Sequence, residues 1–189
     1  MRTVLLRLAA SVLAVCLLSA CPETTVDQDF GLKPLELQPG DWNGLWTSVD
    51  EKEKFQFTVI FPSNGVLRLS DPDDKKEEPS DLRLHRATAD DKIKLCFALM
   101  QDQDDKETKS QVMLMRQPDE GVILAWTIDD LAVEKALKAG QLKGTTQRVK
   151  DDPHNHLATD PANHAKLLEP QFWNWSEPVI FKRVGKPGR

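Results

Sequence analysis

The chain lacks the short motifs that mark the common catalytic folds. It has only nine glycines in 189 residues, and none of them forms the glycine-rich loop that cradles phosphate groups. No serine lies in the Gly-x-Ser-x-Gly turn that presents the nucleophile of many hydrolases. These absences predict a non-enzymatic protein that works without a cofactor.

Apolar runs long enough to form a membrane-spanning helix, about 20 residues, are also absent. The apolar segment at residues 8–20 (LAASVLAVCLLSA) is shorter, and it follows Arg2 and Arg7 with no acidic residue before Glu23. A basic start, a short apolar core and small residues at its end are typical of a secretory signal peptide. We therefore predict that residues 1–20 are a signal peptide.

The end of this segment, Leu18-Ser19-Ala20-Cys21, resembles the lipobox of bacterial lipoproteins. The resemblance implies that Cys21 is lipidated, and several acyl chains at about 0.8 kcal/mol per buried methylene suffice for stable anchoring. In enterobacterial lipoproteins an Asp after the cysteine retains the protein in the inner membrane, whereas this chain has Pro22. We therefore expect the periplasmic face of the outer membrane, with the inner membrane as the alternative.

Cysteine is scarce, and this limits the covalent chemistry of the mature chain. Of three cysteines, Cys16 lies in the predicted signal peptide and Cys21 is the predicted lipidation site, which leaves Cys96. One thiol forms no internal disulfide, although the destination is oxidising. Because Cys96 lies in an alternating apolar run, we expect an inert strand residue and not a nucleophile.

The mature chain is acidic. Without residues 1–20 it has 169 residues, with 23 basic against 30 acidic side chains and a net charge near −7. Nucleic-acid binding depends largely on neutralised phosphates, so this charge argues against a nucleic-acid partner. The length suits one folded domain.

Composition divides the mature chain into three parts. Residues 21–40 are polar and rich in Pro and Gly, which predicts a lipidated N-terminus and a flexible tether. Residues 41–185 form the predicted β-domain, and residues 186–189 are a short tail. Within the domain, apolar and polar residues alternate in short runs near residues 55–61, 66–69, 82–85, 93–99, 112–114, 122–128, 144–149 and 178–184.

Turn and helix signals separate these runs. Pro62-Ser63-Asn64-Gly65 and the segment 117–121 (QPDEG) are typical of tight turns between strands. Residues 131–139 predict one short helix, capped by Asp129 or Asp130 and ended by Gly140. We expect a long polar loop over 150–170, with a helical turn at Asp160-Pro161 as an open alternative. The charged runs at 71–78 and 102–107 read as solvated hairpin loops.

About eight short strands and one late helix predict a mainly β fold, a small antiparallel up-and-down barrel, with a flat α+β sheet as the alternative. Gly44-Leu45-Trp46 resembles the Gly-x-Trp of lipocalin-type barrels, in which the Trp plugs the closed end. The helix followed by Gly140-Gln141-Leu142-Lys143-Gly144, with the late Phe181-Lys182-Arg183-Val184, is similar to uncharacterised bacterial lipocalin-like lipoproteins.

Two sets of residues are candidate binding sites. The first and last strands of a barrel are neighbours, so Trp42 and Trp46 are expected to meet Trp173 and Trp175 along one seam. There they either pack or line a pocket for an apolar or sugar-like ligand. His154, His156 and His164 supply imidazoles that suit zinc or copper, although exposed loop histidines without a ligand are the simpler interpretation.

These patterns predict a membrane-anchored lipoprotein that faces the periplasm and acts in interaction with another envelope protein or in envelope maintenance. The alternative is a lipocalin-like carrier of an apolar small molecule or lipid. Bulky residues expected to face inward favour a filled core and hence the first hypothesis: Phe55, Phe57, Leu95, Phe97, Leu124 and Trp126.

Overall fold

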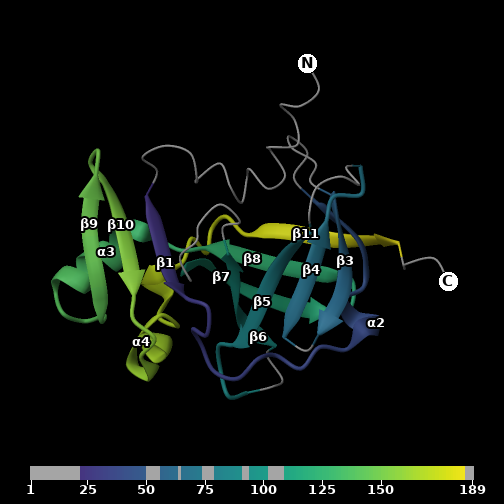
Figure 1. Ribbon diagram of the computed structural model, residues 1–189, viewed down its shortest axis with the longest axis horizontal. Coiled ribbons are helices and arrows are strands. Elements are labelled where there is room, and N and C mark those ends of the chain that lie inside the picture. Colours follow the sequence, from purple (N-terminus) through teal and green to yellow (C-terminus); the bar gives the residue numbers. More distant parts are fainter. Residues whose placement is uncertain are drawn as a thin grey trace.

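The computed structural model describes residues 22–49, 56–63, 65–73, 79–90, 94–101 and 109–185 (Figure 1). The predicted signal peptide (1–20), Cys21, the C-terminal tail (186–189), Phe55 and most of the two charged runs lie outside these residues. In the part of the chain that is described, no helix combines the length and the apolar character needed to cross a bilayer.

Eight strands form a closed antiparallel barrel, which confirms the predicted fold class. Each strand from β2 to β8 pairs with the next, and β11 pairs with both β8 and β2 to close the ring. Closure removes the exposed edges of the meander. The barrel strands are β2 (Gly44–Ser48), β3 (Gln56–Ser63), β4 (Val66–Ser70), β5 (Ser80–Arg86), β6 (Leu95–Gln101), β7 (Lys109–Asp119), β8 (Val122–Thr127) and β11 (Val179–Gly185).

Two predicted turns join consecutive barrel strands. Gly65 lies between β3 and β4 with a φ of +75°, a conformation that glycine adopts without steric cost. Between β7 and β8 the backbone N–H of Gly121 donates to Asp119 Oδ1 at 2.8 Å. β7 itself runs on to Asp119, so this turn is tighter than the five residues predicted for it.

The inner face of the barrel forms one hydrophobic core, which we call the barrel core. Period-two alternation sends every second side chain of each strand into it. Its buried members are Leu37, Trp42, Trp46, Val59, Leu67, Leu82, Leu84, Cys96, Ala98, Met115, Ile123 and Ala125.

The outer face of β6, β7 and β8 forms a second core, the outer core. It buries Phe97, Leu99, Leu114 and Trp126 beneath residues from outside the barrel, such as Phe30. Leu95 and Leu124 pack against the same cluster. The expectation that Leu95, Phe97, Leu124 and Trp126 face inward is therefore wrong. Alternation separates the two faces of a strand, but on a strand buried on both sides it does not say which face is inside.

The outer core is covered by elements from two separated parts of the chain (Figure 1). β1 pairs in parallel with β10 and antiparallel with one end of β7, and β10 pairs antiparallel with β9. β9 and β10 belong to the connection between β8 and β11, which also supplies three further elements, α3, α4 and η2. The covering elements and the short α2 are β1 (Glu23–Asp27), α2 (Pro39–Trp42), α3 (Asp130–Lys138), β9 (Gly144–Val149), β10 (Asp152–Leu157), α4 (Pro161–Lys166) and η2 (Pro170–Phe172).

Helix α3 is the predicted late helix. The Asp129 side chain accepts a hydrogen bond from the backbone of Ala132 and caps the N-terminus, and Gly140 follows the C-terminus with a φ of +69°. The long loop predicted over 150–170 is wrong, because this stretch contains β10 and α4. Its open alternative is confirmed, since Asp160 accepts from the Ala162 N–H and starts α4.

The flexible tether predicted for residues 21–40 is wrong over its described part. Residues 23–27 form β1, and Phe30 and Leu37 are buried in the outer core and the barrel core respectively. In β1 only Thr24 and Val26 are buried, and they alternate with half-buried neighbours. This period-two pattern is too short to be recognised in the sequence. The partners that order this strand, β7 and β10, lie far away in the sequence.

Trp46, the tryptophan of the Gly-x-Trp motif, lies in the barrel core and contacts α2 and β11. Its ring is fully buried, and the Arg183 guanidinium lies 5.2 Å from the ring centroid. The Trp46 indole N–H donates to the Trp42 carbonyl at 2.8 Å, while Arg183 Nη1 donates to the Gly40 carbonyl at 2.7 Å. These contacts join α2 to β2 and to β11, and we call Trp42, Trp46 and Arg183 the plug.

Replacement of Trp46 by Ala is expected to destabilise the protein strongly. The substitution leaves a cavity in the barrel core and removes the surface on which Arg183 rests, so the free energy of unfolding should fall by about 3–5 kcal/mol. Chemical denaturation followed by circular dichroism measures the change. Trp175→Ala is the matched control, because Trp175 is 40% exposed. Equal losses for the two variants would contradict the plug.

Candidate functional site

The four tryptophans predicted to share one seam lie in two separate cores. Trp42 and Trp46 belong to the barrel core, whereas Trp173 belongs to the outer core. Trp175 lies against Trp126, with ring centroids 4.9 Å apart. β11 does lie beside β2, but Trp173 and Trp175 precede β11 and are held by a bridge between Trp173 and Ile128. The single tryptophan cluster is therefore wrong.

The three histidines predicted as a metal site do not converge. His154 and His156 alternate on β10 and share one face, whereas His164 lies in α4. His164 Nε2 accepts a hydrogen bond from the Gly31 N–H at 3.2 Å, and its ring meets Phe30 edge-on. Burial lowers the pKa of His164, which favours the neutral ring. Among the described residues no group of three or more His, Cys, Asp or Glu side chains could hold a metal ion.

His154 and His156 instead line a polar pocket of about 280 Å³ between β1, β10 and β9. His154 Nδ1 lies 3.4 Å from Glu23 Oε2, and His156 Nε2 lies 3.4 Å from Asp27 Oδ1. The Thr25 hydroxyl is 3.1 Å from His156 Nδ1. These side chains therefore join β10 to β1, which holds the N-terminal strand in place.

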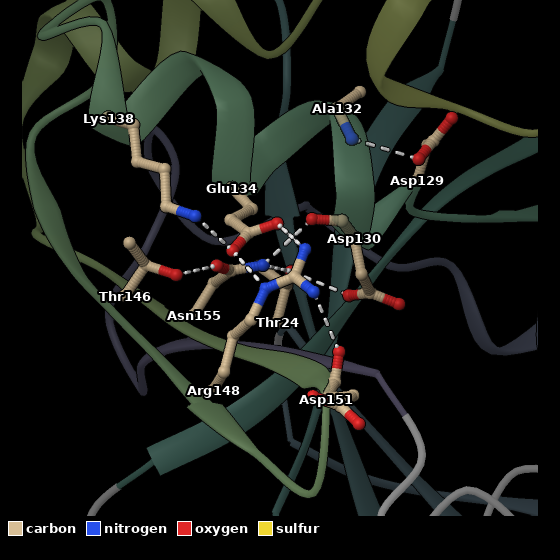
Figure 2. Close-up of polar contacts among 10 residues, drawn as sticks. All are labelled: Thr24, Asp129, Asp130, Ala132, Glu134, Lys138, Thr146, Arg148, Asp151 and Asn155. Atoms are coloured by element: carbon tan, nitrogen blue, oxygen red, sulfur yellow. Dashed lines mark hydrogen bonds and ion pairs between the residues drawn. The ribbon is translucent and has the colours of Figure 1, made fainter.

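The opposite face of β1 and β10 carries a buried chain of hydrogen bonds beneath α3 (Figure 2). Thr146 donates to Asn155 Oδ1 at 2.7 Å, and Asn155 Nδ2 donates to the Thr24 hydroxyl and the Asp130 carbonyl, both at 3.0 Å. The Thr24 hydroxyl donates in turn to Asp130 Oδ1 at 2.6 Å. This chain links β9, β10, β1 and the start of α3.

A second contact fixes α3 to β9 (Figure 2). Arg148 donates through Nε and Nη2 to the two carboxylate oxygens of Glu134, each at 2.8 Å, and Lys138 Nζ donates to Glu134 Oε1 at 2.5 Å. The hydrogen bonds from Arg148, and then from Lys138, lower the pKa of Glu134 to about 2. Glu134 is thus a carboxylate at neutral pH, held by two cations in a bidentate and a single contact.

We call these two sets of contacts the α3 network. They hold α3, β1, β9 and β10 together and expose no reacting group. Each carboxylate in it is bound by donors of the same network, and its hydroxyls and amide bond to each other. Burial raises the pKa of Asp130 to about 6, and the Thr24 hydrogen bond only partly offsets this effect. The α3 network therefore contains one acidic group that titrates near pH 6.

Asp130→Asn is expected to change how stability depends on pH. The folded state holds the Asp130 proton up to about pH 6, above the ordinary value of 3.8. Its contribution to stability is therefore complete below pH 3.8 and is lost as the pH rises through 6. The Asn side chain of the variant can still accept the hydrogen bond from Thr24, but it does not titrate. The fall in the free energy of unfolding with rising pH should therefore disappear, as measured by urea denaturation between pH 4 and pH 7.

The matched control is Glu120→Gln, at the exposed turn between β7 and β8. In this variant the free energy of unfolding should depend on pH as it does in the wild-type protein. The same slope in Asp130→Asn and in the wild-type protein would refute the role assigned to Asp130.

Cys96 is the buried strand residue that the sequence predicts. Its thiol donates to the Met115 carbonyl within the barrel core, and burial raises its pKa to about 12. At neutral pH the thiol stays protonated, so it is a poor nucleophile.

Partly exposed apolar side chains lie around the margin of the barrel core, and we call them the apolar rim. Phe57 lies at the start of β3, where it pairs with Trp46 of β2, while Met100 lies near the end of β6 and Val179 at the start of β11. Phe57 contacts Phe181 edge-on with centroids 5.1 Å apart. The half-buried members that pack on the barrel core are Phe57, Leu69, Met100, Met113, Val179 and Phe181.

The fold defines the class of the protein as a closed eight-stranded antiparallel barrel, consistent with a lipocalin-like fold. Comparison of the chain with protein-family models, with curated proteins and with solved structures finds no match. The function of the protein is therefore inferred from the barrel and from the side chains at its margin.

Proposed function

We propose that this protein is a lipid-anchored, lipocalin-like binding protein that takes an apolar chain, such as a fatty acyl group, through the apolar rim. The observation that carries the proposal is the apolar rim itself. Trp42 and Trp46 of the plug are buried, whereas six apolar side chains on the same core stay half-buried and present an apolar surface to solvent. A partly exposed apolar ring at the mouth of a barrel is the usual setting for a small apolar ligand.

Some bulky residues that the sequence assigns to the barrel interior lie outside it, which weakens the sequence-based argument for a filled core. The bulky Phe97, Leu124 and Trp126 belong to the outer core. Their neighbours that do face inward include the small Ala98 and Ala125. Methionines such as Met113 supply flexible side chains that adapt to an irregular ligand. This reverses the preference for partner binding that the sequence alone suggests.

Lipidation of Cys21 would place the barrel close to a membrane. β1 begins at Glu23, so a single residue, Pro22, separates the proposed anchor from the folded domain. Such a short connection keeps the domain against the bilayer, where apolar chains are the abundant ligand. The periplasmic face of the outer membrane remains the proposed location, with the inner membrane as the alternative.

Bulky substitutions in the apolar rim should block binding. Met113 is half-buried and packs on the barrel core, so the larger indole of Met113→Trp is expected to cover the apolar surface on which a ligand would rest. Affinity for a fluorescent fatty-acid analogue should fall at least about tenfold, which corresponds to ~1.4 kcal/mol. Fluorescence titration with displacement by an unlabelled fatty acid gives the measurement.

Arg116→Trp serves as the control, because Arg116 lies on the same strand, β7, and is exposed on the outer face. It should bind the probe like the wild-type protein. If Met113→Trp binds equally well, or if the wild-type protein does not bind the probe, the carrier proposal fails.

Cys21→Ser should abolish the proposed anchor, because serine lacks the sulfur that accepts diacylglycerol. Cells grown with an alkyne-bearing fatty acid should label the wild-type protein and leave the variant unlabelled. The Cys96→Ser variant controls for general loss of thiols and should remain labelled. Persistent labelling of Cys21→Ser would refute anchoring at this residue.

A further inference from the structure

β9 is the one described strand with a single neighbour. The eight barrel strands close on themselves, and the extension from β7 through β1 and β10 ends at β9. Five of its six residues are exposed. Because the barrel itself is closed, the free edge of the described sheet lies at β9.

The backbone groups that β9 presents to solvent can be assigned from its pairing with β10. The Ala158 N–H donates to the Lys143 carbonyl at 3.0 Å, which makes this pair hydrogen-bonded. Hydrogen-bonded and non-hydrogen-bonded pairs alternate along an antiparallel ladder. The pair of Arg148 with Pro153 is then non-hydrogen-bonded, as suits a proline without an N–H. The outward groups are therefore those of Gly144, Thr146 and Arg148.

β9 also lacks the features that keep a free edge from pairing. Its sequence, GTTQRV, contains no proline or lysine, and its pairing with β10 has no bulge. Its one charged side chain, Arg148, is neutralised by Glu134. β-branched residues fill three of its six positions, which favours an extended backbone.

We propose that β9 pairs antiparallel with β9 of a second copy of this chain, about a two-fold axis at Thr146. This register aligns the outward backbone groups of both strands, with Thr146 opposite Thr146 and Arg148 opposite Gly144. It also sets each Thr145 opposite Gln147 of the other copy, a pair of complementary hydrogen-bonding side chains. No two like charges face each other.

Gly144 makes this register specific. Its φ is +151°, and a Cβ added there would lie 2.1 Å from the His156 carbonyl oxygen, so only glycine fits. The position opposite Arg148 therefore has no side chain, which leaves room for the arginine of the other copy.

The helices of the two copies are compatible with this arrangement. α3 packs over β10 and β9, and neighbouring strands are about 4.8 Å apart. With one helix on each side of the two-fold axis, the two α3 axes lie about 10 Å apart or more, close to the 8–10 Å of packed helices. The two helices therefore leave room for the strand pairing.

Mixed-disulfide formation tests the register directly. In the proposed dimer Thr145 and Gln147 form a non-hydrogen-bonded pair, whose short Cα separation of about 4.5 Å suits a disulfide. Thr145→Cys and Gln147→Cys variants of residues 22–189, which hold every described element, are mixed and mildly oxidised. We expect the 145–147 heterodimer to dominate, while each variant alone stays largely unlinked. Equal homodimer and heterodimer yields, or no crosslinking, would overturn the proposal.

Native mass spectrometry of a second pair of variants distinguishes loss of the outward backbone N–H from loss of the Thr146 hydroxyl. Thr146→Pro removes an outward N–H and should abolish the dimer. Thr146→Val loses the same hydroxyl bond to Asn155 but keeps the N–H, so it should remain dimeric like the wild-type chain. Loss of the dimer in both variants, or in neither, or a monomeric wild-type chain, would contradict pairing through β9. None of these results depends on binding at the apolar rim.

Discussion

The pairing of β11 with both β8 and β2 is the contact on which the rest of the structure depends. It joins the last strand of the chain to the first barrel strand and turns a meander into a closed ring. The same strand carries Arg183 to Trp46, so closure and the plug are made by one element. It also carries Val179 and Phe181 to the apolar rim. The plug and the apolar rim therefore both depend on β11.

Closure has a second consequence for the outer face of the barrel. The strands β6 to β8 are apolar on both sides, so their outer face needs a cover. The connection from β8 to β11 supplies α3, β10 and α4, and β1 adds the strand that joins this layer to β7. The α3 network fixes the layer with buried hydrogen bonds and one bidentate ion pair. Polar contacts that are fully paired in this way specify a single arrangement of the layer.

The sequence predicts local features well, and its errors concern long-range contacts. The caps of α3, the turns at Gly65 and Gly121 and the burial of Cys96 follow from neighbouring residues. The order of β1 does not, because its partners are β7 and β10 and its own pattern is five residues long. Likewise, alternation on β6 shows that Phe97 and Ala98 lie on opposite faces of the strand. Which of the two faces the barrel interior cannot be read from the alternation, because the outer layer buries the other face as well. Only one contact of the α3 network can be predicted from neighbouring residues, the ion pair between Glu134 and Lys138, which are four residues apart on α3. The other cation that binds Glu134, Arg148, lies on β9.

Binding of an apolar chain is tested by comparing the native and denatured masses of the protein purified from its own host, since covalent acyl chains remain in both spectra. If the barrel binds such a chain, the native spectrum contains one additional apolar molecule per protein chain, which is released on denaturation and recovered in an organic extract. Identical native and denatured masses per chain, with an empty extract, would contradict this binding.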